Sequence, residues 1–337
     1  MIKKVSILLL FTCGICFNVN AQDPFLSQAY GAAQFLSPAS VGNGLYQSRA
    51  QSNYRSQTMS GNSLYRTIVA GWDGRYKNKN EDVQNYLGLG GQIISDQVMN
   101  GILQTNYATI NAAYHMYFDE KMQKNFSLGL GASFIQSNLQ LDKLKFYDQF
   151  SQGVFINNSQ SISLQNLNSS ASKISVNTGL LYTKHNENSF VQLSANAFFM
   201  SKPELTINNN ATASGFKSLV FLNFEKEVND NKKTVMAHAS YSNRNNMNQL
   251  LVGAAFSLPF GSYYEYVNRI YAGLFYRVGD AVIPQFSILM NQYRFGISYD
   301  VYSRGMTGAV LNPNSFEISF STSFGRKRSN NFRTIFD

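Results

Sequence analysis

The sequence predicts an all-β fold, a transmembrane antiparallel β-barrel of about 14 strands with a short non-strand N-terminal segment. Three observations predict it. The chain opens with an export leader, apolar and polar residues alternate with a period of two, and the polar face consists mostly of small uncharged residues. A sheet facing bulk water would carry long charged side chains there, whereas the inside of a barrel accommodates small polar ones.

Residues 1–21 have the features of a signal peptide. Two lysines precede an apolar stretch over residues 5–17, and the sequence predicts cleavage after Ala21. The apolar stretch is too short to remain in the membrane as a spanning helix. Both cysteines, Cys13 and Cys16, lie in this leader, so we expect a mature chain without thiols or disulfides. We also expect no cofactor and no metal site.

Composition excludes several other classes of protein. Charged residues make up 14% of the chain, below the quarter or so that is usual for soluble domains, and aromatic residues also reach 14%. After the leader, no run of about 18 apolar residues predicts a membrane helix, so only a closed barrel would satisfy its backbone hydrogen bonds in lipid. The net charge is +9, but the basic residues are mostly scattered, so nucleic acid is not an expected partner.

The alternation is clearest in four segments, 126–136, 189–199, 294–301 and 316–324. In the first, Phe126, Leu128 and Leu130 share one face, while Ser127 and Gly129 share the other. The same reading along the chain predicts strands at residues 46–55, 64–76, 86–95, 104–118, 125–136, 173–183, 189–199, 217–227, 233–243, 249–258, 270–278, 281–289, 292–302 and 315–324. An even number of strands is expected of a bacterial barrel formed by one chain.

The connections indicate an orientation. With the N-terminus in the periplasm, the connection after the fifth strand, residues 141–172, is extracellular, and its apolar residues predict packing into the mouth or against a partner. The dipeptide Gly279-Asp280 predicts a two-residue hairpin. Trp72 and many tyrosines are expected at the two membrane interfaces, in contact with outer-membrane lipid.

Four parts are therefore expected: the signal peptide (1–21), a periplasmic N-terminal segment (22–44), the outer-membrane barrel (45–325) and a basic periplasmic tail (326–337). Two prolines interrupt the N-terminal segment, and its apolar residues predict that it plugs or crosses the periplasmic mouth. The tail is expected either to be solvated or to contact a periplasmic protein.

One group of charged residues is a candidate site. Their positions predict side chains that point into the lumen, and the first and last strands are neighbours in a closed barrel. The group either consists of structural ion pairs or forms a docking site for an inserted segment of a partner. Its members are Arg49, Arg55, Asp73, Arg75, Arg277, Arg294, Asp300 and Glu317.

Two motifs near the start of the mature chain resemble the PorP/SprF family of the type IX secretion system. The first is QDPFLSQAYGAAQFLSPASVG over residues 22–42, and the second is NYRSQ over residues 53–57. In the C-terminal third, AG at 272–273, YR at 276–277, Asp280, SYDV at 298–301 and SFEIS at 315–319 follow in the order of the family. The sequence departs from the family pattern at Ala33, Ser37 and Thr58, which leaves open which role this member has.

The resemblance implies a non-enzymatic outer-membrane component of the secretion and gliding machinery. Such a protein secretes and anchors a large cell-surface adhesin by docking its type B C-terminal signal. Periplasmic partners would be the lipoprotein ring of the system or a peptidoglycan-binding protein. Two alternatives stay open. One is a passive transport barrel for small or hydrophobic solutes, which needs an open lumen. The other is a barrel hydrolase, which needs a serine or carboxylate against His115, His185 or His238 at the outer rim.

Overall fold

The computed structural model describes residues 24–28, 30–59, 62–76, 85–144, 147–151, 154–155, 169–200, 215–228, 232–244, 247–261, 268–302, 313–327 and 333–337. The predicted leader, residues 1–21, lies outside this part of the chain. Among the described residues, no helix is both long and apolar enough to cross a membrane.

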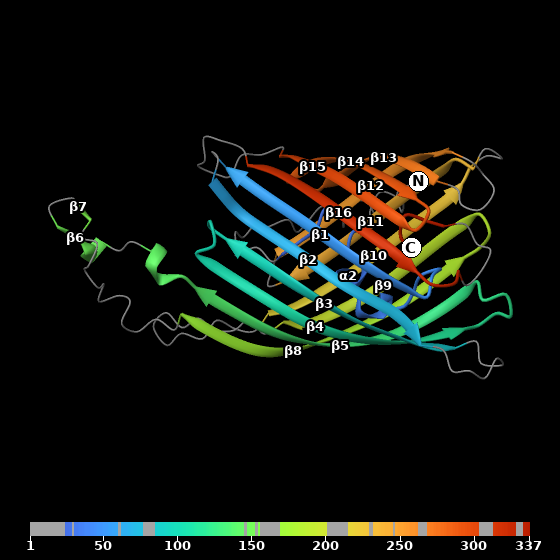
Figure 1. The fold of residues 1–337 in the computed structure, drawn as a ribbon, viewed down its shortest axis with the longest axis horizontal. Helices are drawn as coiled ribbons and strands as arrows, with labels where there is room; N and C mark the ends of the chain where they lie inside the picture. Colours follow the sequence, from blue (N-terminus) through green and yellow to red (C-terminus); the bar gives the residue numbers. More distant parts are fainter. Residues whose placement is uncertain are drawn as a thin grey trace, which may run out of the picture.

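Fourteen strands close into one antiparallel barrel (Figure 1). Each pairs with its neighbour in the chain, and β1 closes the ring against β16 through the register Arg55 to Glu317. The barrel strands are β1 (Ser48–Met59), β2 (Asn62–Tyr76), β3 (Tyr86–Val98), β4 (Leu103–Tyr117), β5 (Lys124–Leu139), β8 (Ser170–His185), β9 (Ser189–Met200), β10 (Gly215–Glu227), β11 (Thr234–Arg244), β12 (Met247–Phe260), β13 (Asn268–Arg277), β14 (Ala281–Met290), β15 (Tyr293–Tyr302) and β16 (Asn314–Phe324). The predicted fold class and strand number are confirmed.

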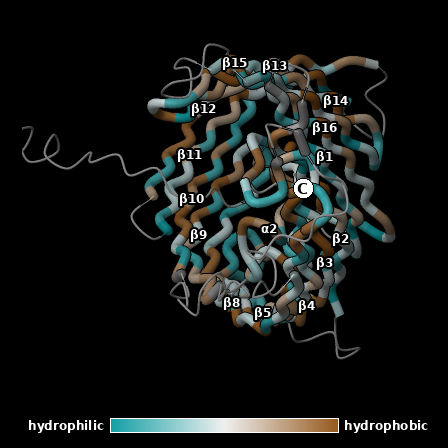
Figure 2. Tube along the Cα trace, turned by 90° about the vertical axis from the view of Figure 1, so that its left-hand side faces the viewer, coloured by the Kyte–Doolittle hydropathy of each residue, from teal (hydrophilic) through white to brown (hydrophobic). Residues whose placement is uncertain are grey.

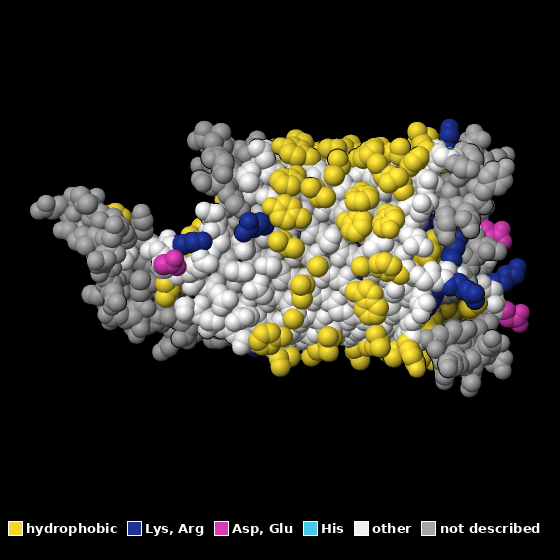
Figure 3. All heavy atoms as spheres, viewed as in Figure 1, with side chains coloured by type: hydrophobic (Ala, Val, Ile, Leu, Met, Phe, Trp, Pro, Cys, Tyr) yellow, Lys and Arg dark blue, Asp and Glu magenta, His cyan; other side chains and the backbone are white. Residues whose placement is uncertain are grey.

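The period of two places apolar side chains outside and small polar ones inside. In β5, Leu128 and Leu130 are exposed on the outer surface, while Ser127 and Gly129 are buried. On the face shown in Figure 3, large apolar side chains cover the middle of the barrel, with lysine and arginine toward its two ends. Trp72 is 53% exposed on this outer surface. It lies two residues before Gly74, which pairs with Ser48 at the start of β1.

The two ends of the barrel differ in their connections. The three longest, residues 140–169, 201–214 and 303–313, join strands at the same end, which we call the long-loop end. The other end, where β1 starts and β16 finishes, is called the short-turn end. Outer-membrane barrels have short periplasmic turns and longer extracellular loops, so the long-loop end is the one expected outside the cell.

The structure corrects the expected length of one connection and one of the two alternatives expected for another. The link between β13 and β14 has three residues, because Arg277 pairs with Ala281, and Gly279 supplies a positive φ of 76°. The long connection after β5 contains a two-stranded sheet of β6 (Phe150–Ser151) and β7 (Val154–Phe155). This small sheet lies well outside the barrel (Figure 1) and does not pack into its mouth.

Candidate functional site

The N-terminal segment runs through the inside of the barrel. Pro24 lies near the long-loop end, among residues of β1, β12 and β13, and Leu45 lies at the short-turn end. Between them are a helical turn, α2 (Ala33–Leu36), and a 3-10 turn, η1 (Pro38–Ser40). Looking from the long-loop end, α2 lies within the ring of strands (Figure 2). We call residues 24–28 and 30–47 the plug. The sequence predicts a segment that plugs or crosses the periplasmic mouth, and in the structure it runs along the lumen from one end of the barrel to the other.

Glycines in the wall make room for η1. A Cβ atom added to Gly88 would lie 2.0 Å from the Val41 carbonyl oxygen, and one added to Gly129 would lie 2.3 Å from the Ala39 nitrogen. A Cβ atom added to Gly179, which pairs with Gly129, would lie 3.0 Å from Ser37 Oγ and 3.1 Å from Pro38 Cδ. The plug therefore packs directly against glycines on the inner face of the wall, because any larger side chain there would overlap the plug backbone.

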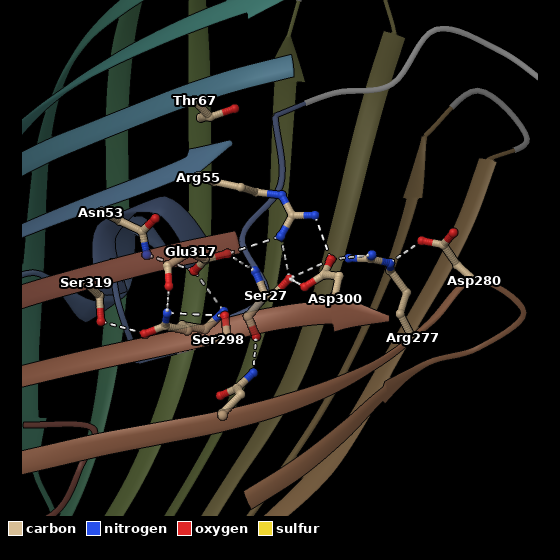
Figure 4. A network of polar contacts seen from close by, with 12 residues as sticks. Ser27, Asn53, Arg55, Thr67, Arg277, Asp280, Ser298, Asp300, Glu317 and Ser319 are labelled. Atoms are coloured by element: carbon tan, nitrogen blue, oxygen red, sulfur yellow. Dashed lines mark hydrogen bonds and ion pairs between the residues drawn. The ribbon is translucent and has the colours of Figure 1, made fainter. Parts of the chain in front are cut away.

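Four of the predicted charged residues form one polar network with Ser27 of the plug (Figure 4). Glu317 accepts hydrogen bonds from two successive backbone N–H groups, those of Ser27 at 2.6 Å and Gln28 at 3.0 Å. Asp300 accepts from the Ser27 hydroxyl at 3.0 Å and from Arg55 at 2.7 Å. Arg277 donates to the same carboxylate at 2.6 Å. We call these residues, with Ser27, the Ser27 cluster.

The ring of Phe25 adds an aromatic contact to this cluster. The guanidinium carbons of Arg55 and Arg277 lie 4.2 Å and 4.1 Å from the ring centroid. Arg277 also contacts the Asp280 carboxylate at the edge of the barrel. Two guanidinium groups face two buried carboxylates, so the charges of the inner cluster balance, as burial requires.

The occupant of the cluster is a segment of the same chain. Gln285 donates to the Ser27 carbonyl at 2.8 Å, and the side-chain amide of Gln28 reaches the Glu317 carbonyl at 3.0 Å. Both the backbone and the side chains of the plug are thus matched by the wall. Sequence reasoning placed the charges on inward-facing positions but did not identify Ser27 and Gln28 as their partners.

A second polar group surrounds the last five residues, 333–337, which we call the C-terminal pentapeptide. Arg49 is paired with Asp73 at 3.1 Å and donates to the Asp337 carbonyl oxygen at 3.2 Å. Arg294 donates to the carbonyl of Ile335. Arg75 donates to the backbone carbonyls of Gly44 and Leu45, each at 3.2 Å, and so holds the base of the plug.

The eight predicted residues therefore come from neighbouring strands but form two groups along the barrel axis. Arg55, Arg277, Asp300 and Glu317 lie toward the long-loop end, and Arg49, Asp73, Arg75 and Arg294 lie toward the short-turn end. The expectation of a solvated tail is wrong for the C-terminal pentapeptide, which is buried. Its two apolar side chains explain the difference, because Ile335 and Phe336 join the largest buried apolar cluster.

Two buried residues near the pentapeptide were not predicted. Glu225 accepts from the Ile335 N–H at 3.0 Å and from the Tyr271 hydroxyl at 2.7 Å. Arg269 donates to the Arg333 carbonyl at 3.0 Å. Both occupy inward positions of regular strands, so the same alternation identifies them once their strands are assigned.

The histidines do not form a hydrolytic site at the outer rim. His115 lies 2.6 Å from the Ser127 hydroxyl, but it is fully buried near the short-turn end, and its other nitrogen lies 2.7 Å from the Val41 carbonyl. His238 lies against Asn223 and Ser240. His185 is the last residue of β8 rather than part of a turn. In the part of the chain that the structure describes, no group of three histidine, cysteine or acidic residues could hold a metal ion.

A family model described as type IX secretion system membrane protein PorP/SprF matches residues 18–322. The chain belongs to this family. The membership and the barrel fold together identify an outer-membrane barrel of type IX secretion. In this PorP/SprF protein, the motifs that carry the sequence resemblance contribute Ser27, Arg55, Arg277, Asp300 and Glu317, which form the Ser27 cluster.

Several solved structures are similar to this PorP/SprF protein. A Pseudomonas aeruginosa FadL homologue is 9% identical, with 88% of this chain and 97% of that chain covered and a TM-score of 0.49. The CymD monoaromatic hydrocarbon channel is 13% identical, with 92% and 96% covered and a TM-score of 0.46. The chain spans 60% of CdiB from Acinetobacter baumannii, at 9% identity, 82% coverage of this chain and a TM-score of 0.39. No curated protein matches the chain.

Proposed function

We propose that this protein is a non-enzymatic anchor that secretes and displays a large cell-surface adhesin by docking its C-terminal signal. The observation that carries the proposal is the occupied lumen. The plug fills the barrel from the long-loop end to the short-turn end, and the C-terminal pentapeptide is buried beside its base. A barrel that is filled by its own chain offers its mouths and loops to partners, rather than a pathway for solutes.

The two mouths have different partners in this proposal. The long-loop end faces the cell surface, where the adhesin would be held. The short-turn end faces the periplasm, where the lipoprotein ring or a peptidoglycan-binding protein of the secretion system would bind. Arg326 and Lys327 follow the last strand at this end and precede the pentapeptide in the chain. They are basic residues available for such a contact.

Passive transport of small or hydrophobic solutes is the alternative. The occupied lumen counts against it, because Glu317, Asp300 and Gln285 all bind the plug backbone or the Ser27 hydroxyl at distances of 2.6–3.0 Å. Transport would require these contacts to open.

The test is a cross-linked pull-down of the tagged barrel from outer membranes. We expect a very large secreted protein with a type B C-terminal signal and a periplasmic ring component to co-purify. A matched barrel of another family, tagged and expressed at the same level, serves as the control. Normal surface display of every adhesin in cells that lack this barrel would overturn the anchoring role.

Two of the predicted charged residues, one from each group, give a residue-level version of the test. In the docking proposal, Asp300→Ala or Arg294→Ala blocks adhesin display while barrel levels stay normal, because Asp300 binds Ser27 of the plug and Arg294 lies over the ring of Tyr30 in the plug. Display is measured by antibody binding to intact cells, and barrel levels by immunoblot. Normal display at normal barrel levels would exclude a docking role for these residues.

A further inference from the structure

A cavity of about 270 Å³ lies at the long-loop end beside the first residue of the plug. Its wall combines Phe25 and Tyr302 with Met247 and Val278, and its polar lining includes Arg277. The described lining contains three cationic side chains, Lys217, Arg244 and Arg277, and a single carboxylate, that of Asp280. The described lining therefore combines apolar and aromatic surface with polar side chains, and it has more cationic groups than carboxylates.

Arg277 is the residue that indicates a ligand. Its side chain is 2% exposed, its Nη2 donates to Asp300 and its Nε donates to Asp280. Its Nη1 is buried and has no acceptor among the described residues. A buried guanidinium N–H without an acceptor is costly, because it has lost water and gained nothing in return. The rings of Phe25 and Tyr302 lie 4.1 Å and 5.7 Å from its central carbon, so a ligand held there would contact aromatic surface.

We propose that this cavity binds a carboxylate carried on an apolar or aromatic group, with Arg277 Nη1 as its donor. A carboxylate is the acceptor that best matches a guanidinium, and the volume suits one ring or one terminal residue of a peptide. At the opposite end, an arginine of the same barrel already donates to a backbone oxygen, since Arg49 donates to Asp337. The proposed site goes beyond adhesin docking, because its ligand is defined only as a carboxylate. Both a free acid and a polypeptide terminus carry that group.

The test uses purified full-length protein in detergent with ¹³C-labelled methionine methyl groups. Met247 lines the cavity and reports binding, while the buried Met236 reports the fold. The probes are 3-phenylpropionate for a free acid and N-acetylphenylalanine for a chain terminus, each compared with its neutral amide. We expect at least one acid to shift the Met247 signal in a saturable way and its amide to have no effect. Stronger binding of one acid identifies the source.

Two variants make the proposal falsifiable. Arg277→Gln should weaken binding of the acid by about tenfold or more, because a charged hydrogen bond is lost. Asp280→Asn should strengthen it several-fold, because a competing negative charge at the cavity is removed while the barrel wall is kept. An unchanged Met236 signal shows that each variant is folded. Equal binding of acid and amide, or an unchanged affinity in Asp280→Asn, would overturn the proposal.

Discussion

At the scale of single residues, Asp300 is the point where the plug, β1 and β13 meet. Its carboxylate accepts from Arg55, Arg277 and the Ser27 hydroxyl, and its side chain is fully buried. Replacing it by asparagine puts a neutral amide beside two buried guanidinium groups in place of a carboxylate. Loss of one partner of a buried ion pair typically costs about 3 kcal/mol or more.

Asp300→Asn should therefore lower the free energy of unfolding by about 3 kcal/mol. The measurement is guanidinium unfolding of the barrel in lipid vesicles, followed through the fluorescence of Trp72, which is the only tryptophan of the chain. Asp142→Asn is the control, because Asp142 is exposed in η2 (Leu141–Lys143). Equal midpoints for Asp300→Asn and wild type would show that the ion pairs contribute nothing to stability.

The sequence predicts the inward direction of Asp300 and Glu317 because a strand reverses its side chains at every residue. It does not predict what they bind. The hydrogen bond from Ser27 to Glu317 joins residues 290 positions apart, and the plug has no regular period that would show which of its residues face the wall. Such contacts depend on how the segment threads the closed barrel.

At the scale of elements, η1 and the glycines beneath it form one packing unit. Gly129→Val should displace η1, because even a Cβ atom at this position lies within 2.4 Å of Ala39 Cα. In protein produced without residues 1–21, Ala39→Cys supplies the only thiol. We expect this buried thiol to resist a polar maleimide in an otherwise wild-type barrel and to react at least tenfold faster when Gly129→Val is added.

Gly91→Val is the matched control for that experiment. Gly91 belongs to β3, two strands away from the β5 strand of Gly129, and a Cβ atom there meets only the Thr109 carbonyl oxygen at 3.5 Å, an ordinary contact distance. The control should leave the Ala39→Cys reaction rate unchanged. Fast labelling of Ala39→Cys both with and without Gly129→Val would mean that η1 is not packed against the wall glycines.

The C-terminal pentapeptide is the second element that seals the barrel. Phe336 is 8% exposed, and its ring is stacked on that of Phe190, with centroids 5.6 Å apart. Phe336→Ala should lower the unfolding free energy by about 3 kcal/mol, as for other buried phenylalanines. The same unfolding assay measures it, with Phe118→Ala as the control, because Phe118 is 67% exposed. A loss no larger than that of the control would mean that the pentapeptide is loosely held.

The difference between predicted and observed elements has a physical cause. Barrel strands repeat their pattern over ten or more residues, so the alternation identifies them. The pentapeptide offers only Ile335 and Phe336 within a basic tail, and β6 and β7 have two residues each. Segments this short have no period to detect, and their position is set by tertiary contacts.

At the scale of the whole molecule, the barrel is closed in two senses. Its sheet has no free edge, because β1 pairs with β16 over the whole length of β1 except Met59. Its lumen is occupied, because the plug and the pentapeptide both make hydrogen bonds with inward-facing side chains of the wall. The first closure follows from the sequence pattern, and the second follows from the fit between the wall and the two chain ends.

The occupied lumen predicts the electrical behaviour of the protein. In planar lipid bilayers, the wild-type barrel should conduct almost no ions. Deletion of residues 22–44 should produce stable channels, because a barrel of 14 strands is wider than the eight-stranded barrels whose interiors side chains just fill. The Gly91→Val barrel serves as the silent control, since its plug is kept. High conductance of the wild-type protein would favour the transport alternative, and a silent deletion variant would mean that the wall alone closes the lumen.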